Sequence, residues 1–282
     1  MNELSFHQIK IFFQDQLIQN LILSKREAVI EFNQILQFIF KMDYAKLLSQ
    51  SPQISKRQLQ QIKKIINLRI KGTPLAYIFK EWDFYGRKFF LNKSCLIPRP
   101  DTELMIDILK KESSKEEITT LLDLGSGSGV IGITAKLEIP SIEKLVLTDM
   151  SKRCLKIIKK NLFIHNLSAD IYLSDWFKKL PEQKFDVVVS NPPYIARDDD
   201  HLIHLAFEPR RALIANNHGL SDIETILKNG VNFLSNNGKL FIEHGYNQKQ
   251  NVQEIFKRYN YKDVVSFKDL TGNYRITKGV RK

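Results

Sequence analysis

The feature that most constrains how this chain can fold is a glycine-rich run, residues 123–129, which directly follows an apolar segment. The run reads Asp-Leu-Gly-Ser-Gly-Ser-Gly, and the pattern of residues 130–137 after it is helical. Successive glycines allow positive φ and let a ligand lie against bare backbone, while a helix start supplies free N–H groups. We therefore expect a strand, a ligand-binding turn and a helix, the first unit of an α/β sheet.

Strand and helix patterns continue to alternate beyond this unit. The expected strands are residues 119–124, 144–148, 170–173, 185–189, 239–243, 264–267 and 274–277, the last two as a hairpin. The expected helices are residues 130–137, 151–161, 221–234 and 248–259. Such alternation predicts a mostly parallel sheet with helices on both faces. In such sheets, ligands bind beyond the carboxyl ends of the strands.

Residues 1–80 place apolar residues at helical spacing, which predicts a helical domain. This domain holds 12 Lys and Arg against 5 Asp and Glu, more than half of the chain's excess positive charge. The charge fits either a domain that docks a partner or a solvated basic helix face. Residues 81–98, with aromatic residues around Gly86, predict a β-hairpin hinge. Residues 99–282 are expected to form the α/β domain.

The composition limits the classes of binding partner and the cellular compartment that fit the chain. A net charge of +12 favours a polyanionic partner such as RNA, or a partner working beside one, although a lysine-rich proteome explains it equally well. The two cysteines, Cys95 and Cys154, lack a CxxC spacing, which argues against a cysteine zinc site and fits a reducing cytoplasm. Charged residues interrupt residues 1–20, so no signal peptide is expected, and no apolar window predicts a membrane span.

Two carboxylates accompany the glycine-rich run. Asp149, 20 residues past Gly129, ends the second expected strand and can accept hydrogen bonds from both ribose hydroxyls of a nucleoside. This arrangement serves a dinucleotide or S-adenosylmethionine, and residues 127–132 spell the GxGxxG pattern of nicotinamide binding. Asp123, however, would repel phosphates and suits the ammonium of a methionine moiety. Trp176, after the third strand, offers an indole either to pack on adenine or to cap the core.

A second motif, Asn191-Pro192-Pro193-Tyr194, follows the fourth expected strand. Pro192 keeps the preceding Asn191 extended, and Pro193 has no N–H to bond a local carbonyl. The Asn191 side-chain oxygen and the Pro192 carbonyl can then hold both hydrogens of one planar NH₂ group, which Tyr194 can cover. Two such acceptors orient a weak nitrogen nucleophile toward an activated methyl group. The motif leaves open whether that nitrogen belongs to adenine, cytosine, guanine or glutamine.

These motifs and six further segments resemble the HemK/PrmC family, the protein-(glutamine-N5) methyltransferases of class I release factors. The resemblance covers nearly the whole chain, and its most distinctive segment is residues 96–103. The other segments are residues 72–78, 84–86, 207–213, 243–245 and 269–275. The chain departs from the family at Lys80, where glycine is frequent, and at Ser126, where threonine is commoner.

The resemblance implies a class I S-adenosylmethionine-dependent methyltransferase fold in residues 99–282. This is a Rossmann-like, seven-stranded, mostly parallel sheet, preceded by an N-terminal helical bundle and a β-hairpin linker. The implied cofactor is S-adenosylmethionine, which leaves as S-adenosylhomocysteine. Its implied binding residues are Asp123, Gly125, Ser126, Gly127, Ser128, Gly129, Asp149, Trp176 and Asn191.

The implied substrate is a class I peptide chain release factor, methylated on the side-chain amide nitrogen of the glutamine in its Gly-Gly-Gln loop. Asn191, Pro192 and Tyr194 are the implied catalytic residues. The implied substrate-binding residues are Asn191, Pro192, Pro193 and Tyr194, with Phe89 and Arg99 near the pocket mouth. A cytoplasmic monomer that binds no membrane, and needs no stable nucleic-acid binding, is expected.

Two other functions stay open on the sequence alone. A nucleic-acid N-methyltransferase would use the same tetrapeptide on an exocyclic base amine, but no inserted target-recognition domain is visible in the chain. A non-catalytic adaptor would bind S-adenosylmethionine or RNA through its basic helices, and the intact tetrapeptide argues against it.

The remaining polar clusters predict no further chemistry. Residues 198–200 with His201 and His204 have the pattern of a solvated loop, so no metal is expected. Glu208 and Arg210 are expected to brace the loop after Tyr194 by an ion pair. The isolated histidines, to which no catalytic role is given, are His165, His218 and His244.

Overall fold

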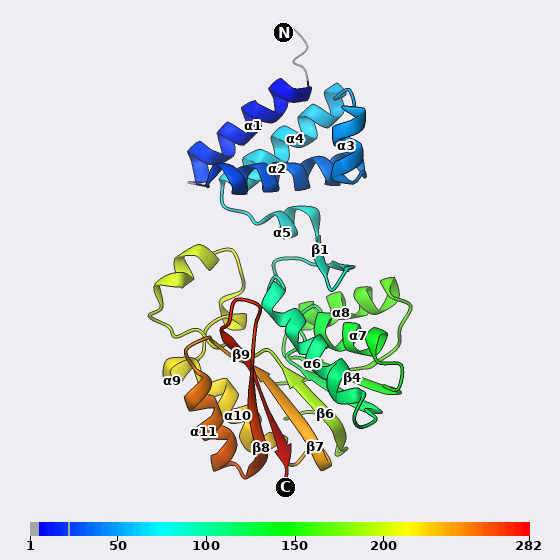
Figure 1. Ribbon diagram of the computed structural model, residues 1–282, viewed down its shortest axis with the longest axis vertical. Coiled ribbons are helices and arrows are strands. Elements are labelled where there is room, and N and C mark those ends of the chain that lie inside the picture. The colour runs from blue at the N-terminus through cyan, green and yellow to red at the C-terminus, as the bar shows by residue number, and fades with distance from the viewer. Residues whose placement is uncertain (1–5, 22) are drawn as a thin grey trace. The chain divides into compact units, whose positions relative to one another are not determined.

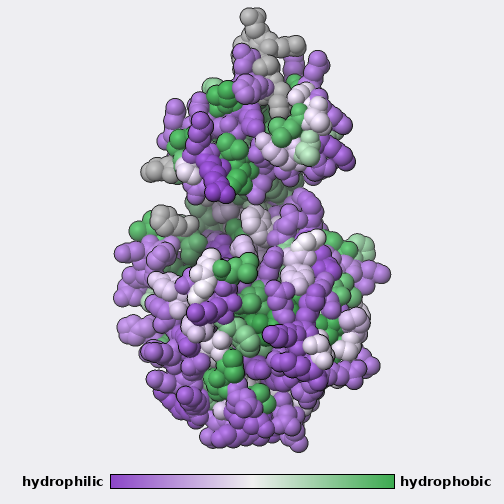
Figure 2. Space-filling model, viewed as in Figure 1, coloured by the Kyte–Doolittle hydropathy of each residue, from purple (hydrophilic) through white to green (hydrophobic). Residues whose placement is uncertain are grey.

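The computed structural model describes residues 6–21 and 23–282, so expectations for residues 1–5 and 22 lie outside its described part. The chain forms two compact units, residues 1–80 and residues 81–282. Figure 2 shows that hydrophilic residues predominate on the visible surface of each unit. No helix in the described ranges combines the length and the apolar character that crossing a membrane requires.

The first unit is helical, as the sequence predicts. Its helices are α1 (Phe6–Leu21), α2 (Lys25–Phe40), α3 (Tyr44–Gln50), α4 (Lys56–Ile70) and α5 (Leu75–Phe79) (Figure 1). Their apolar faces meet in one core, where Leu17, Phe32 and Ile62 are fully buried. Ser24 and Ser55 start α2 and α4 with capping boxes, each of which stabilises its helix by about 1 kcal/mol. A docking role for this unit stays a prediction.

The second unit is a seven-stranded sheet in the order β5-β4-β3-β6-β7-β9-β8. Its strands are β3 (Thr120–Leu124), β4 (Lys144–Asp149), β5 (Asp170–Leu173), β6 (Phe185–Ser190), β7 (Leu234–Glu243), β8 (Tyr261–Lys268) and β9 (Tyr274–Arg281). The first five in this order are parallel, β9 is antiparallel to β7, and β8 is antiparallel to β9. The sheet confirms the predicted fold class, including the closing hairpin.

Helices cover both faces of this sheet. They are α6 (Glu103–Ser113), α7 (Val130–Glu138), α8 (Lys152–Ile164), α9 (Asn216–Gly219), α10 (Ser221–Gly230) and α11 (Lys249–Arg258). Short 3-10 turns lie between elements: η1 (Pro100–Thr102), η2 (Asp200–Leu205) and η3 (Arg210–Ala212). Figure 1 shows α6, α7 and α8 on one side of the sheet and α9, α10 and α11 on the other.

The strands are apolar because side chains of both faces are buried. In β3, Leu121 packs into the core beneath α6, α7 and α8, while the next residue, Leu122, packs into the core beneath α10 and α11. Val187 and Val188 of β6 divide between the two cores in the same way. Burial on both faces holds these strands in one register and makes their carboxyl edge a firm platform for a site.

A hairpin precedes the sheet at the predicted place and consists of β1 (Glu81–Phe84) and β2 (Arg87–Phe90). Its turn residues, Tyr85 and Gly86, both have positive φ, as a tight hairpin turn requires. The fully buried Asn161 of α8 accepts a hydrogen bond from the Phe90 N–H at 2.7 Å and donates to the Phe90 carbonyl at 3.1 Å. The hairpin thus belongs to the second unit, and its role as a hinge stays a prediction.

One strand is longer than its sequence pattern indicates. The sequence predicts a strand over residues 239–243, but β7 already begins at Leu234. It also predicts a helix that ends at residue 234, but α10 ends at Gly230. Residues 235–238 read Ser-Asn-Asn-Gly, a typical turn composition. The strand nevertheless pairs with β6 from Leu234 onward, across a register shift.

Lys80, the departure from the family pattern ahead of the hairpin, occupies a backbone conformation that favours glycine. It ends α5 with φ 60° and ψ 25°, in the left-handed region. A side chain there costs roughly 1–2 kcal/mol, which glycine avoids. The structure therefore explains why glycine suits this position.

We expect Lys80→Gly to raise the free energy of unfolding of the first unit by about 0.5 kcal/mol, since relief of backbone strain outweighs the greater freedom of glycine in the unfolded chain. Lys71→Gly is the matched control, because Lys71 ends α4 at φ −73° and glycine gains nothing there. Urea unfolding followed by circular dichroism measures both. Equal effects of the two substitutions would contradict the explanation.

Candidate functional site

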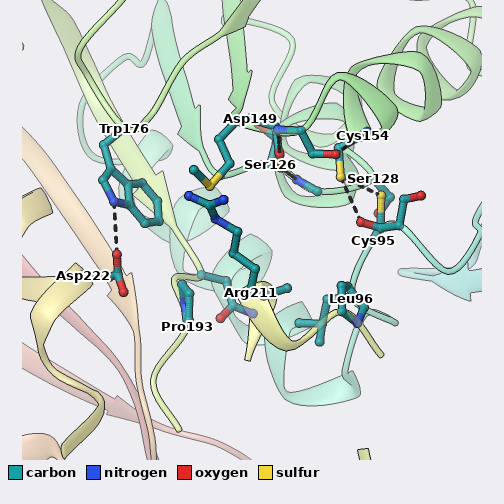
Figure 3. Close-up of a pocket in the computed structure, with 18 of the residues that line it drawn as sticks. Cys95, Leu96, Ser126, Ser128, Asp149, Cys154, Trp176, Pro193, Arg211 and Asp222 are labelled. Atoms are coloured by element: carbon teal, nitrogen blue, oxygen red, sulfur yellow. Dashed lines mark hydrogen bonds between the residues drawn. The ribbon is translucent and has the colours of Figure 1, made fainter. Parts of the chain in front are cut away.

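A cavity of about 520 Å³ lies at the carboxyl edge of the sheet, beyond the ends of β3, β4, β5 and β6 (Figure 3). The expected site residues that line it are Gly125, Ser126, Gly127, Ser128, Asp149, Trp176, Asn191 and Pro193. The expected site residues that do not line it are Asp123, Gly129, Pro192, Tyr194, Phe89 and Arg99. The parallel strands therefore bring the glycine-rich run and the Asn-Pro-Pro-Tyr motif to one cavity.

The glycine-rich loop needs its glycines. Gly125, Gly127 and Gly129 have φ values of 68°, 58° and 82°, which only glycine adopts without strain. Space also restricts Gly125, because a Cβ built there would lie 3.0 Å from the Trp176 ring. The indole therefore packs directly against bare backbone, and both line the cavity.

Asp149 fixes the loop to the end of β4. Its carboxylate accepts a hydrogen bond from the Gly127 N–H at 3.0 Å and another from the Ser151 N–H at 2.8 Å. The Ser126 N–H donates to the Thr148 carbonyl at 2.8 Å, which adds a second tie. Burial raises the pKa of Asp149, and the two backbone N–H groups offset part of that rise. Each carboxylate oxygen keeps a lone pair for a further donor.

Trp176 is held from behind by a second carboxylate. Its Nε1–H donates to Asp222 of α10 at 3.2 Å, and Figure 3 shows this bond at one end of the cavity. Arg211, on η3, projects into the same cavity in Figure 3. Burial raises the pKa of both Asp149 and Asp222, and the positive charge of Arg211 offsets part of that rise. The sequence analysis missed Arg211 and Asp222, and only the family-like segment 207–213 contained a signal for Arg211.

Asp123 lies beneath the glycine-rich loop. Its side chain is 1% exposed, and one oxygen accepts a hydrogen bond from the Gly132 N–H of α7 at 2.9 Å. Its other oxygen, Oδ1, has no hydrogen-bond partner. Burial raises the pKa of Asp123 to about 7. A buried carboxylate with a free oxygen favours a cation beside it, because an unpaired charge away from water is costly.

The Asn191 side chain reaches the cavity from the end of β6. Its Nδ2 donates to the Thr102 hydroxyl at 3.4 Å, which leaves the side-chain oxygen as the acceptor end of the amide. The loop that follows is held from behind by Gln248, whose Nε2–H donates to the Tyr194 carbonyl at 2.9 Å. Gly219 allows this close approach, since a Cβ there would lie 2.0 Å from the same carbonyl oxygen. Burial raises the pKa of Tyr194, so its phenol stays neutral.

Phe89 and Arg99, expected near the pocket mouth, lie elsewhere. Phe89 is fully buried in the core, where its ring contacts the ring of His165 at a centroid distance of 4.5 Å. Arg99 forms an ion pair with Glu208, which also accepts a hydrogen bond from the Ile97 N–H at 3.0 Å. The geometry gives no support to substrate contacts by these two residues, which stay a prediction. The expected pairing of Glu208 with Arg210 is wrong, because Arg99 occupies that carboxylate.

Other residues near the site need no chemical role. The cavity wall includes Cys95 and Cys154, whose sulfur atoms are 3.4 Å apart and buried. His244 is fully buried between the Gly245 carbonyl and the Thr277 hydroxyl, and burial lowers its pKa, so it is neutral. Within the described ranges, no three His, Cys, Asp or Glu side chains gather as a metal site would need.

The arrangement can hold two ligand groups side by side. One part offers an aromatic face, a carboxylate with free lone pairs and bare backbone, which together suit a nucleoside. The other part presents the Asn191 side-chain oxygen, which suits the hydrogens of an NH₂ group.

Comparisons with known proteins agree with this geometry. The profile of the family "Methyltransferase small domain" matches residues 100–269. A release factor glutamine methyltransferase of Buchnera aphidicola (subsp. Acyrthosiphon pisum) is 38% identical over 231 residues, 80% of this chain and 82% of that protein. One from Pasteurella multocida is 34% identical over 273 residues, 90% of each chain.

A solved structure is similar in fold. It is a 16S rRNA N2 methyltransferase of T. thermophilus in complex with AdoMet and guanosine, with a TM-score of 0.53 and 15% identity over 72% of this chain and 50% of that one. At this identity the likeness concerns the fold alone. Because the two named relatives, 38% and 34% identical, match 80% and 90% of this chain, the chain belongs to the family of the release factor glutamine methyltransferases.

Proposed function

We propose that this protein transfers a methyl group from S-adenosylmethionine to the side-chain amide nitrogen of a glutamine in the Gly-Gly-Gln loop of a class I release factor. The observation that carries the proposal is Asn191, with its side-chain oxygen available at a cavity that the glycine-rich loop also lines. The names of relatives that are 38% and 34% identical support the substrate.

The residues of the cavity fit the cofactor. S-adenosylmethionine supplies a methyl group activated by a sulfonium. Asp149 has lone pairs left for the ribose hydroxyls, and Trp176 offers its indole face to the adenine. Asp123 lies beneath the glycine-rich loop and does not line the cavity, so it is the negative charge of its carboxylate that suits the ammonium of the methionine moiety. Gly125 to Gly129 lie against the part of the ligand between the ammonium and the ribose.

The acceptor side orients the nucleophile. An amide nitrogen is a weak nucleophile because its lone pair is delocalised. The Asn191 side-chain oxygen and the Pro192 carbonyl each accept one hydrogen of the glutamine NH₂, so that the nitrogen faces the methyl group. The same two oxygens stabilise the positive charge that develops on nitrogen, and one N–H proton then leaves to solvent. Pro193 keeps the turn rigid, and Tyr194 covers the flat amide.

The proposal includes the setting of the reaction. The enzyme acts as a cytoplasmic monomer on a protein partner, and needs neither a membrane nor a stably bound nucleic acid. The positive charge of the chain suits work beside an RNA-rich partner such as the ribosome.

The substrate assignment is tested with labelled S-adenosylmethionine. We expect label on an intact class I release factor, located by mass spectrometry on the Gly-Gly-Gln glutamine, and none on a Gly-Gly-Ala variant of the factor. DNA and RNA are incubated in parallel. Label on nucleic acid alone would favour a base-amine methyltransferase, and RNA binding without any turnover would favour an adaptor.

We expect Asn191→Ala to lower the single-turnover rate by about 10²-fold, because it removes an acceptor that orients the amide and stabilises its developing charge. Affinity for S-adenosylmethionine should change far less. Asn229→Ala, on the exposed face of α10, is the matched control and should keep the full rate. A near-normal rate in the Asn191 variant would refute the role given to this residue.

Cofactor affinity should depend on pH through Asp123, whose pKa is raised to about 7 by burial. Above that pH the carboxylate is charged and attracts the ammonium, and below it the protonated form does not. We expect the Kd for S-adenosylmethionine to increase by about tenfold from pH 8 to pH 6, measured by calorimetry.

Asp123→Asn should bind more weakly at pH 8 and show a smaller change with pH, since the carboxylate proposed to attract the ammonium is removed. Asp170→Asn, exposed on β5, is the control and should behave like the unmodified protein. A Kd that stays constant from pH 8 to pH 6 would rule out attraction of the ammonium by the Asp123 carboxylate.

A further inference from the structure

A buried carboxylate lies behind the proposed acceptor site. β7 ends at Glu243, and its register with β6 pairs Ile242 with Ser190. The next residues of the two parallel strands, Glu243 and Asn191, therefore lie side by side at the carboxyl edge of the sheet. Glu243 is 1% exposed and does not line the cavity. It can reach a substrate only through another residue.

The strand register places the Glu243 carboxyl group beside the Asn191 amide. Burial raises the pKa of Glu243 to about 7, and the neighbouring Thr102 and Asn191 side chains offset part of that rise. The Thr102 hydroxyl also accepts a hydrogen bond from Asn191 Nδ2 at 3.4 Å. The second carboxyl oxygen, Oε2, has no hydrogen-bond partner. The acceptors behind Asn191 therefore outnumber the donors.

The other charged groups around Glu243 are engaged elsewhere. Arg275 on β9 forms ion pairs with Asp101 at 3.0 Å and with Asp269 at 2.9 Å. Tyr194 and His244 are neutral, because burial raises the pKa of the first and lowers that of the second. Within the described ranges Glu243 forms no ion pair, and the Thr102 hydroxyl and the Asn191 amide are polar groups beside its carboxylate.

We propose that Glu243 is a positioning residue for methyl transfer, because it holds the Nδ2 end of the Asn191 amide inward and thereby keeps the Oδ1 end facing the reacting NH₂ group. This inference rests on the proposed function. The two ends of an asparagine amide have nearly the same shape, so only hydrogen bonds choose between them. A carboxylate accepts and never donates, so it selects the Nδ2 end. In the reversed orientation, two NH₂ groups would face each other and transfer would stop.

Protonation of Glu243 removes this selection. A protonated carboxyl group carries an O–H that can donate to Asn191 Oδ1, so both amide orientations become acceptable. The rate of transfer at saturating cofactor should therefore fall as the pH decreases through about 7. Titration of Asp123 acts on cofactor affinity, and saturation with cofactor separates the two effects.

Glu243→Gln tests the proposal, since glutamine keeps the shape but offers a donor as well as an acceptor. At pH 8 we expect the single-turnover rate on release factor to fall by about tenfold. The decrease of the rate at low pH should be lost, and the Kd for S-adenosylmethionine should stay within about twofold. Glu254→Gln, exposed on α11, is the matched control and should change neither rate nor pH profile.

A double-substitution cycle separates positioning from a general structural role. If Glu243 acts through Asn191, then Glu243→Gln should cause less than about a twofold further loss in an Asn191→Ala background. Equal losses in both backgrounds, or a normal rate in the single Glu243 variant, would overturn the proposal.

A second measurement needs neither a substrate nor a substitution of Glu243. The ¹⁵N–¹H signals of the Asn191 side-chain NH₂, assigned by their absence in Asn191→Ala, should shift with an inflection near pH 7 in the cofactor-bound protein. Signals that do not respond to pH would refute the proposal even if release factor is methylated. A clear response without any methylation of release factor would instead refute the proposed function and leave the positioning intact.

Discussion

The site depends on one constraint, the parallel alignment of β3, β4, β6 and β7, because parallel strands end at the same edge of a sheet. Backbone hydrogen bonding places the ends of these strands about one strand spacing apart, roughly 4.8 Å. Asp149 ends β4, Asn191 follows β6 and Glu243 ends β7. Since the sheet is buried on both faces, a shift in strand register would disrupt the packing of both hydrophobic cores. The relative positions of these polar groups are therefore fixed before any ligand arrives.

Two of the carboxylates near this edge lower the stability of the folded protein when they are charged. Burial raises the pKa of both Asp123 and Glu243 to about 7, well above that of an unfolded chain. Each therefore holds its proton more tightly in the folded state, so the folded protein loses stability as the pH rises from about 4, the unfolded pKa, to about 7. Each also has one oxygen without a hydrogen-bond partner. Such strain is typical of residues whose position serves a ligand or a reaction, and it agrees with the roles proposed for both.

What the sequence predicts well is set by neighbouring residues. The positive φ of Gly125 and the strand–helix alternation follow from local composition, and both are confirmed. What it misses depends on which distant segments meet. Thr102 lies 89 residues before its partner Asn191, and nothing local connects Glu208 with Arg99. Phe89 shows a related difficulty, because an alternating pattern in a hairpin does not reveal which face packs into the core.

Charge at the cavity also bears on the choice between a dinucleotide and S-adenosylmethionine. The glycine-rich loop lies between Asp123 beneath it and Asp149 beside it, and both carboxylates are hydrogen-bonded to its backbone or to the helix after it. A pyrophosphate on this loop would place anions against two buried carboxylates at low dielectric, which is strongly unfavourable. A ligand with an ammonium and a sulfonium reverses the sign of that interaction. Although residues 127–132 match the nicotinamide pattern, the carboxylates around them favour the proposed cationic cofactor.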